Sequence, residues 1–267
     1  MYSITRTETV RPAAANPSTR RMHVQIAILE DAGFRVPEGA KILDLGCGNG
    51  NLVAEYRRAG YRAYGCDLAF KPGPNTDELA RKGHIRRIDR TPYRLPFEDR
   101  EFDFVLSDQV FEHVQNYDET LAEHRRVLKP SGAGLHFIPS RYAPVEGHVF
   151  VPFATILQSY WWLRLWAQLG VRTKAQAGMS AQERARRNAH YLRTSTNYLT
   201  KPELRRAFGR YFAEVRWVEH LFLKYSRRAR MLHSLSQLIP VVPEAYSALR
   251  SRVVLCAAPI VRLPRYS

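Results

Sequence analysis

An α/β fold, with a doubly wound and mostly parallel sheet, is the class that the sequence predicts. Short apolar runs alternate with helical segments over the first half of the chain. Such alternation is typical of a parallel sheet with helices on both faces. One run, residues 41–45 (KILDL), leads directly into a glycine-rich turn, as a buried parallel strand does. The 267 residues, 45% of them hydrophobic, can bury a substantial core, which excludes global disorder.

Nearly all of this alternation lies before Pro139. A first helix is expected over 18–32, because its apolar positions recur at helical spacing and Gly33 follows as a stop signal. The other expected helices cover 51–59, 76–82 and 118–128, the last of them capped by Asp118. The expected strands cover 41–45, 61–68, 84–88, 102–107 and 133–138, and residues 129–132 form a turn before the last of them.

The pattern changes after Pro139. Residues 150–171 are nearly all apolar and hold three of the four tryptophans. This run is long enough to span a bilayer, but Arg164 lies inside it. A charged side chain deep in a membrane costs about 2.5–3.5 kcal/mol. We therefore expect a buried or interfacial helix here.

Two capping-box sequences predict where the next helices begin. Ser180 is followed three residues later by Glu183, and Thr200 by Glu203. In this spacing the two side chains satisfy free backbone N–H groups at a helix start. Beyond them, strands are expected over 213–219 and 252–258, with a basic, apolar helical segment over 221–238 between them.

The net charge of +16 is concentrated in the second half of the chain. Residues 1–140 hold 20 Lys and Arg against 19 Asp and Glu, a net charge of +1, so residues 141–267 carry +15. Such a field attracts phosphate, carboxylate or an anionic membrane surface. The bias toward arginine can equally reflect genome composition, and both interpretations stay open.

Cysteine usage and the N-terminal sequence bear on metals and localisation. Cys47, Cys66 and Cys256 are widely spaced, without a CxxC pair, which argues against a structural zinc site and a disulfide scaffold. We expect no metal. The first twenty residues are polar and basic without an apolar segment, so we expect no signal peptide and a cytoplasmic protein.

The segment that carries the chemistry is residues 44–50 (DLGCGNG), between a strand and a helix. Its glycines let the backbone approach a ligand closely, and the following helix offers free N–H groups. Asp67, about twenty residues on, can accept both hydroxyls of a ribose. A dinucleotide-binding loop would need glycine or alanine at position 51, which is Asn51. Asp44 suits a cationic ligand better than a pyrophosphate, and this is the pattern of S-adenosylmethionine binding.

Five short sequence blocks, which occur in the same order as in a known protein family, carry a specific resemblance. They are residues 42–50 (ILDLGCGNG), 64–68 (YGCDL), Asp89 with 95–97 (LPF), 102–114 (FDFVLSDQVFEHV) and 126–132 (RVLKPSG). Over about residues 20–140 the chain resembles class I S-adenosylmethionine-dependent methyltransferases, in particular the small-molecule branch of ubiquinone/menaquinone type. Ser131 departs from the glycine usual in that family.

The resemblance implies a Rossmann-like sheet of about seven strands with the last strand antiparallel, plus a helical lid insertion. It implies S-adenosylmethionine as cofactor and S-adenosylhomocysteine as product. Its cofactor positions correspond to Asp44 and Gly46 beside the methionine part, Gly48 at the close approach, Asp67 at the ribose, Leu68 and Asp89 at the adenine, and Ser107 near the transferred methyl. The expected organisation is a flexible arm (1–17), a cofactor-binding core (18–140), a substrate lid (141–212) and final core strands with a basic helix (213–267).

A hydroxyl acceptor needs a base within hydrogen-bond reach. The candidates are His148, in the loop after the fifth strand, and His113, just past the fourth; a purely structural role for either stays open, and Asp108 and Glu146 are also available. Tyr142, Glu146 and Trp161 are the expected substrate contacts.

The leading functional interpretation is methyl transfer to an oxygen or nitrogen of a small-molecule, glycan or lipid-linked acceptor. Peripheral membrane contact through the basic half, with Lys224, Arg227, Arg228 and Arg230, is a further expectation. An RNA methyltransferase is the alternative, disfavoured because residues 107–110 read SDQV where amino-methylating nucleic-acid enzymes have Asn/Asp-Pro-Pro-Tyr. A non-catalytic cofactor-binding or scaffold protein and a dinucleotide-dependent oxidoreductase are further alternatives.

Overall fold

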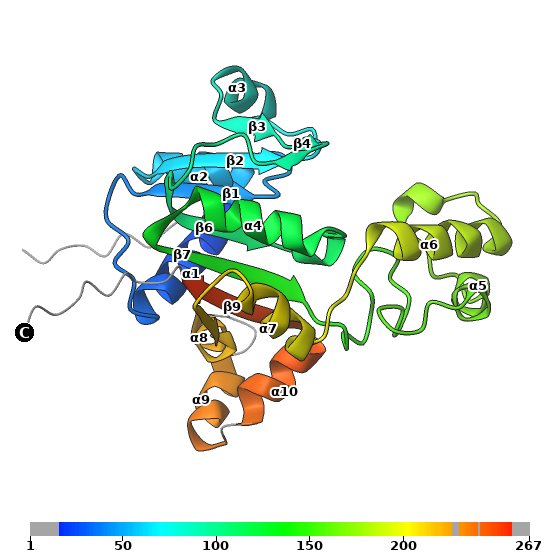
Figure 1. The fold of residues 1–267 in the computed structure, drawn as a ribbon. Helices are drawn as coiled ribbons and strands as arrows, with labels where there is room; N and C mark the ends of the chain where they lie inside the picture. The colour runs from blue at the N-terminus through cyan, green and yellow to red at the C-terminus, as the bar shows by residue number, and fades with distance from the viewer. Residues whose placement is uncertain (1–15, 226–229, 240, 258–267) are drawn as a thin grey trace, which may run out of the picture.

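A seven-stranded sheet forms the centre of the protein in the computed structural model, which describes residues 16–225, 230–239 and 241–257 (Figure 1). In spatial order the strands are β3 (Ile85–Arg87), β2 (Arg62–Asp67), β1 (Lys41–Leu45), β6 (Phe102–Asp108), β7 (Leu128–Pro139), β9 (Ser251–Ala257) and β8 (Glu214–Trp217). The first five are parallel, and β9 runs antiparallel to both of its neighbours. The predicted fold class is therefore confirmed.

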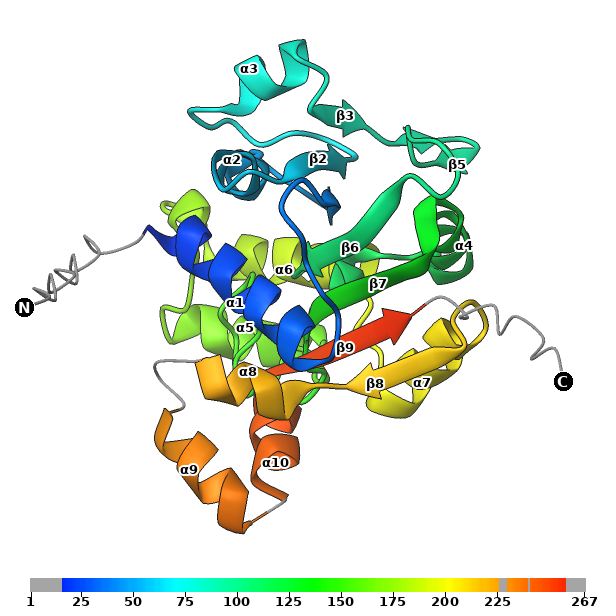
Figure 2. The ribbon, with the colours of Figure 1, turned by 90° about the vertical axis from the view of Figure 1, so that its left-hand side faces the viewer.

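Helices cover both faces of the sheet (Figure 2). The helices before β7 are α1 (Pro17–Asp31), α2 (Asn51–Arg58), α3 (Thr76–Arg81) and α4 (Tyr117–Val127). A 3-10 turn, η1 (Phe111–His113), follows β6. The remaining ones are α5 (Tyr160–Gln168), the 3-10 turn η2 (Lys174–Gln176), α6 (Ala181–Ser195), α7 (Lys201–Gly209), α8 (Glu219–Tyr225), α9 (Arg230–Leu238) and α10 (Val241–Leu249). A short hairpin of β4 (Asp89–Arg90) and β5 (Tyr93–Arg94) follows β3.

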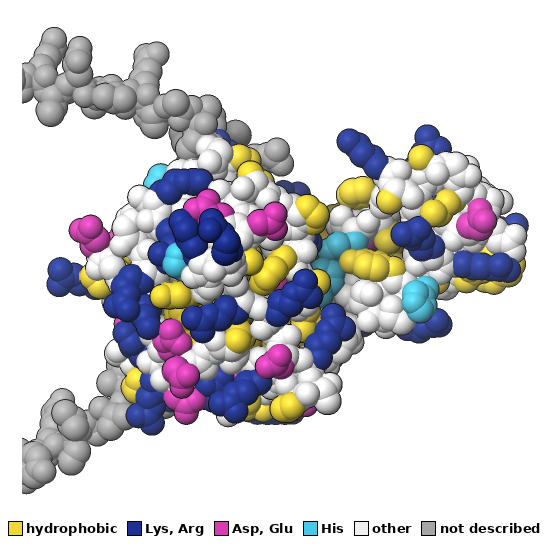
Figure 3. Space-filling model, turned by 90° about the horizontal axis from the view of Figure 1, so that it is seen from above, with side chains coloured by type: hydrophobic (Ala, Val, Ile, Leu, Met, Phe, Trp, Pro, Cys, Tyr) yellow, Lys and Arg dark blue, Asp and Glu magenta, His cyan; other side chains and the backbone are white. Residues whose placement is uncertain are grey.

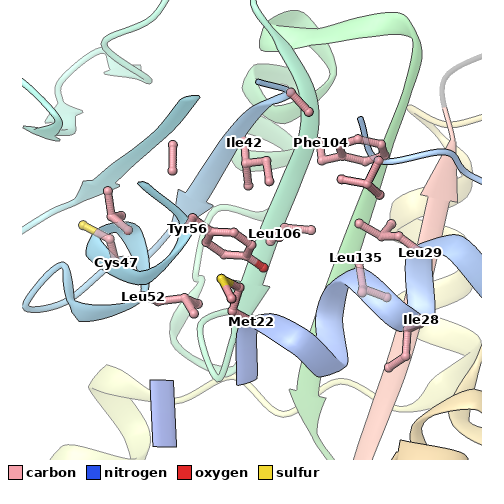
Figure 4. Packing of buried hydrophobic residues seen from close by; sticks show 14 of the residues in the cluster. Met22, Ile28, Leu29, Ile42, Cys47, Leu52, Tyr56, Phe104, Leu106 and Leu135 are labelled. Carbon is pink, nitrogen blue, oxygen red and sulfur yellow. The ribbon is translucent and has the colours of Figure 1, made fainter. Parts of the chain in front are cut away.

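The side chains of β1 point alternately to the two faces of the sheet and contribute to a buried core on each face. Ile42 of β1 packs with Ile28 of α1 and Tyr56 of α2 in one buried cluster (Figure 4). Leu43, the next residue, packs with Leu121 and Phe208 in the other, under α4 and α7. Because successive side chains of a strand point to opposite faces, the continuous apolar run of β1 serves both cores.

The apolar run 150–171 is not one helix, and that expectation was wrong. Only Tyr160–Gln168 is helical, and Phe150 and Phe153 have positive φ angles of 60° and 54°. Ser159 begins the helix by accepting a hydrogen bond from the backbone N–H of Trp162. The apolar side chains instead form a separate cluster with α6, made by Val149, Val151, Ala154, Leu163, Ala185 and Leu192.

The predictions for the helix starts and for the turn at residues 129–132 had different outcomes. Both capping boxes are present at Ser180 and Thr200. The N-cap of α4 is Asn116 and not Asp118 as expected; Asp118 lies in the first turn, where its charge favours the helix N-terminus. Residues 129–132, expected to be a turn, lie within β7, which meets β6 through an irregular register.

The segment 221–238 is not a single helix. Its described part consists of α8 and α9, and residues 226–229 between them, including Arg227 and Arg228, lie outside the described residues. The expected arm is likewise outside them up to residue 15. Among the described helices, none combines the length and hydropathy needed to cross a bilayer.

The turn after β1 depends on a glycine for two reasons. Gly46 has a φ of +77°, and a Cβ built there would lie 2.3 Å from Cγ2 of Val110. Gly39 also has a positive φ, +74°, but a Cβ there would meet nothing within 4 Å. The two positions therefore differ in close packing and not in backbone strain.

Gly46→Ala should destabilise the ligand-free protein by about 1–3 kcal/mol more than Gly39→Ala, because overpacking adds to the shared φ strain. Urea unfolding of both variants measures the difference. The double variant Gly46→Ala/Val110→Ala should recover part of the loss. Equal destabilisation of the two single variants would contradict this packing argument.

Candidate functional site

The carboxyl edge of the sheet, where β1, β2 and β6 end, gathers most of the predicted cofactor residues. The strand order reverses between β1 and β6, and ligands of open α/β sheets bind at such a switch point. The backbone N–H groups of Gly46 and Cys47 donate to the Cys66 carbonyl at 2.8 and 3.1 Å. The N–H of Gly48 donates to Oδ2 of Asp67 at 2.8 Å. The glycine loop is thus held against the end of β2.

Leu68 and Asp89 lie at the same edge. The side chain of Leu68 follows Asp67 directly and is 41% exposed, high for a large apolar residue. The N–H of Ile88 donates to the Asp67 carbonyl at 3.0 Å, so Asp89 begins the β4–β5 hairpin beside the end of β2, with its side chain exposed. The adenine-contact roles of Leu68 and Asp89 remain predictions, supported by this proximity.

Three acidic side chains lie around the glycine loop. Asp44 is buried, and burial together with the carboxylates of Asp108 and Asp67 raises the pKa of Asp44 to about 8. Arg21 of α1 opposes this effect, and its Nε lies 2.9 Å from Oδ2 of Asp108. Three carboxyl groups still outnumber the two cations described beside the loop, Arg21 and Lys71, whose side chain lies 3.7 Å from a Cβ built on Gly48. A cationic ligand would favour the ionised forms of these carboxyl groups.

Ser107 does not face this cleft, and the expectation for its side chain was wrong. It is fully buried, and its Oγ lies 2.8 Å from Nδ1 of His136 on β7. Ser107 alternates with Leu106 and Asp108 along β6 and so points to the opposite face of the sheet. Asp108, the next residue and the last of β6, is the side chain of this strand that joins the acidic group.

The two candidate bases meet each other. Nε2 of His113, in η1, lies 3.1 Å from Nε2 of His148, in the loop after β7. Nδ1 of His113 donates to the Ser195 carbonyl at 2.7 Å, and Nδ1 of His148 donates to Oε1 of Glu146 at 2.7 Å. The second bond raises the pKa of His148, whereas burial lowers the pKa of His113.

Glu146 holds the loop after β7 in place, and its expected contact with the substrate stays a prediction. Its carboxylate is fully buried and accepts hydrogen bonds from the N–H groups of His148 and Val149 at 2.8 and 2.7 Å. It also accepts from the His148 ring and from the hydroxyl of Tyr198 at 2.5 Å. With four donors on two oxygens, it has little capacity left for a ligand.

Glu112 is the functional candidate that sequence reasoning passed over. Its side chain is fully buried, and neither carboxylate oxygen has a hydrogen-bond partner among the residues that the structure describes. Burial raises the pKa of Glu112 to about 8. Its Oε1 lies 3.8 Å from Nε2 of His113. In sequence it was only the neighbour of His113, since burial of a carboxylate leaves no sequence signal.

Tyr142 and Trp161 are both on the surface. Tyr142 is 46% exposed and Trp161 is 72% exposed, with the Arg164 guanidinium 5.8 Å from the indole ring. Their expected roles as substrate contacts stay predictions.

Residues 43–135 match the protein family described as "Methyltransferase domain". A demethylmenaquinone methyltransferase from Tropheryma whipplei is 30% identical over 125 residues, covering 42% of this chain and 50% of that protein. A ubiquinone biosynthesis O-methyltransferase from Roseobacter denitrificans is 35% identical over 113 residues, covering 40% and 46%. The chain thus spans about half the length of these relatives.

Among solved structures, geranyl diphosphate C-methyltransferase from Streptomyces coelicolor is similar, with a TM-score of 0.48 and 20% identity, covering 90% of this chain and 80% of that one. Over residues 43–135 the chain is similar to this methyltransferase family, and the Rossmann-like sheet topology agrees with that similarity. Within that family it resembles the small-molecule branch, as the ubiquinone and menaquinone relatives show.

Asp44→Asn should stabilise the ligand-free protein at alkaline pH. Because the folded-state pKa of Asp44, about 8, lies above the ordinary carboxyl value of 3.8, the folded chain retains a proton that the unfolded chain has lost. Stability therefore falls as pH rises between about 4 and 8. At pH 9 the variant should melt at least about 2–4 °C higher than the parent, the shift that about 1 kcal/mol produces.

Thermal melts at pH 4 and pH 9 test this, because the advantage of Asp44→Asn should nearly vanish at pH 4. Asp77→Asn, at an exposed site in α3, is the control and should melt like the parent at both values. A pH-independent gain would mean that desolvation of the Asp44 charge is not its source.

Proposed function

We propose that this protein transfers a methyl group from S-adenosylmethionine to an oxygen or nitrogen of a small-molecule, glycan or lipid-linked acceptor. The observation that carries the proposal is the acidic group of Asp44, Asp67 and Asp108 around the glycine loop. S-adenosylmethionine bears an ammonium and a sulfonium, which such a pocket stabilises, whereas the pyrophosphate of a dinucleotide would be repelled.

Each cofactor residue has a chemically suitable position. Asp44 favours the cationic methionine end, and the glycine at 48 permits close approach of the backbone. Asp67 accepts one N–H from the loop and a weaker one from Ala69 at 3.3 Å, which leaves lone pairs for the ribose hydroxyls. Leu68 offers apolar surface and Asp89 an acceptor to the adenine. When bound, the cofactor supplies an electrophilic methyl group on a good leaving group.

Within this proposal His148 is the general base. Its Nδ1–H is held by the buried Glu146 carboxylate, so its Nε2 lone pair is directed away from that carboxylate and can accept a proton. Glu146 also stabilises the imidazolium that results, which is the cause of the raised pKa of His148. His113 contributes by its contact with His148 and can receive the proton from it.

Residues 141–212 would act as the substrate lid of this core. Their apolar cluster packs α5 against α6 in a lobe beside the carboxyl edge (Figure 1). The chain returning from α6 contacts the core where Asn197 donates its backbone N–H to the Glu112 carbonyl at 2.6 Å and its side-chain N–H to the Val114 carbonyl at 3.0 Å. The acceptor would bind between this lobe and the loop after β1. The last helix of the segment, α7, packs on the sheet.

An apolar or membrane-bound acceptor fits two observations. The named relatives include demethylmenaquinone and ubiquinone-biosynthesis methyltransferases. Large apolar side chains are also exposed at the end formed by α9 and α10: Leu235, Leu238, Ile239 and Val241. We propose that this end touches a membrane surface. Lys224, expected to contribute, is instead paired with Asp31 at 2.6 Å, so the apolar residues would carry most of the contact.

Asp67→Ala should weaken binding of S-adenosylhomocysteine about 10–100-fold. Losing hydrogen bonds to a charged acceptor costs about 1.5–3 kcal/mol, and each 1.4 kcal/mol is tenfold in affinity. Calorimetric titration measures this, with Asp77→Ala as the matched surface control and NAD as a ligand that should not bind. Unchanged affinity in Asp67→Ala would falsify the assigned cofactor site.

Methyl-labelled S-adenosylmethionine, incubated with the protein and a cell extract, should label the lipid or the soluble small-molecule and glycan fraction. His148→Ala should reduce the label about 10²–10⁴-fold, the usual contribution of a general base. His190→Ala, an exposed histidine of α6, should label like the parent. Label in the nucleic-acid fraction would instead support the RNA alternative and overturn the proposed acceptor class.

A further inference from the structure

Three potential metal ligands from separate parts of the fold converge where the core meets the insertion. Glu112 and His113 belong to η1, and His148 belongs to the loop after β7. One ligand atom of each lies within 4.8 Å of the others. The two imidazoles are partly exposed, with 36% and 30% of their side chains accessible. Figure 3 shows histidine side chains at the surface between the body of the sheet and the lobe of α5 and α6.

The hydrogen bonds of the two histidines direct lone pairs toward each other. Each Nδ1–H is donated, by His113 to the Ser195 carbonyl and by His148 to Glu146. In the neutral rings both Nε2 atoms are then bare acceptors, although they lie 3.1 Å apart. Metal-bound histidines commonly donate their other N–H to a backbone carbonyl or a carboxylate. Both arrangements occur here, one on each ring.

The spacing suits a metal ion. Nitrogens bound at about 2.0–2.1 Å to one ion lie about 2.9–3.4 Å apart for octahedral to tetrahedral angles, and the observed separation falls in that range. Oε1 of Glu112 lies 3.8 Å from the His113 nitrogen, so it would have to move closer to share an ion with the two nitrogens.

Glu112 provides an independent argument. A fully buried carboxylate without a donor among the described residues is costly. A cation at the Nε2 atoms would stabilise the ionised form of Glu112 and occupy its lone pairs. Glu146 cannot serve in its place, because its oxygens already accept four hydrogen bonds.

We propose that Glu112, His113 and His148 bind one divalent first-row transition ion of the Zn²⁺ type. Two imidazoles and one carboxylate favour such ions over Mg²⁺ and Ca²⁺, which prefer all-oxygen sites. Three protein ligands leave at least one coordination position open to an oxygen of a bound molecule. The ion would also join η1 to the insertion. This binding does not depend on the proposed methyl transfer, but an ion on Nε2 of His148 would occupy the lone pair that the proposed general base uses, so only the metal-free protein could use His148 as that base.

Two other states compete with this assignment. A single proton could be shared by the two Nε2 atoms, with no affinity for metal. An added ion could also bind His124, His136 and Cys256, whose ligand atoms lie equally close but are all fully buried. The Nδ1 of His136 is already engaged by Ser107 there, and its Nε2 faces the Cys256 thiol at 3.6 Å.

The test uses the full chain, stripped with chelator and titrated with Zn²⁺ and separately with Co²⁺. We expect one equivalent to bind with micromolar or tighter affinity, without requiring S-adenosylmethionine, and Mg²⁺ to bind at least tenfold more weakly. Glu112→Gln, His148→Gln and the positioning variant Glu146→Gln should each lower Zn²⁺ affinity about 10–100-fold. His190→Gln controls for adventitious surface binding and should leave the affinity unchanged, and circular dichroism checks that each variant is folded.

The Co²⁺ spectrum separates the remaining outcomes. Visible ligand-field bands without a thiolate-to-metal charge-transfer band support the nitrogen and oxygen site. A charge-transfer band that disappears in Cys256→Ala would place the ion in the core and overturn the proposal. So would the absence of saturable binding up to about 1 mM, the result expected of a shared proton. Metal binding without S-adenosylhomocysteine binding would instead refute only the proposed function.

Discussion

The buried carboxylate of Glu146 is the interaction on which the second half of the site depends. It fastens the loop after β7 through two backbone N–H groups, orients His148 through its ring, and reaches the chain that returns from α6 through Tyr198. A buried carboxylate is stable only with several donors. Satisfying this one ties the start of the insertion to its returning chain and orients the ring of His148, whose Nε2 lies 3.1 Å from that of His113.

At the glycine loop the situation is the opposite: the buried acidic side chains have too few partners that balance them. Around the glycine loop, burial and neighbouring carboxylates raise the pKa of Asp44, and Arg21 balances only part of the charge. The same imbalance that reduces stability without a ligand is what would favour a cationic one. Glu112 repeats this condition beside the histidine pair. In both halves, a nearby cation would favour ionisation of a buried carboxyl group whose pKa is raised.

The errors of the sequence-based predictions follow from what sequence patterns cannot contain. The apolar run 150–171 has the composition of a helix, yet its first residues form an irregular segment that packs against α6. Apolar side chains are stabilised by burial in this lobe whether or not their backbone is helical. Ser107 occupies the expected strand end but points to the other face of the sheet. Nothing in the sequence shows that Tyr198, 52 residues from Glu146, donates a hydrogen bond to its carboxylate.

The sequence by itself determined the sheet, the turn after β1 and the carboxylate at the end of β2. These depend on local properties: apolar runs, glycines that permit positive φ angles, and the short distance along the chain between Asp44 and Asp67. Only the tertiary structure decided that His113 and His148 meet, that Glu112 is buried without a donor, and that Arg21 opposes the acidic group. Those contacts join residues far apart in the chain, and their energies depend on burial, which arises only when the whole domain has folded.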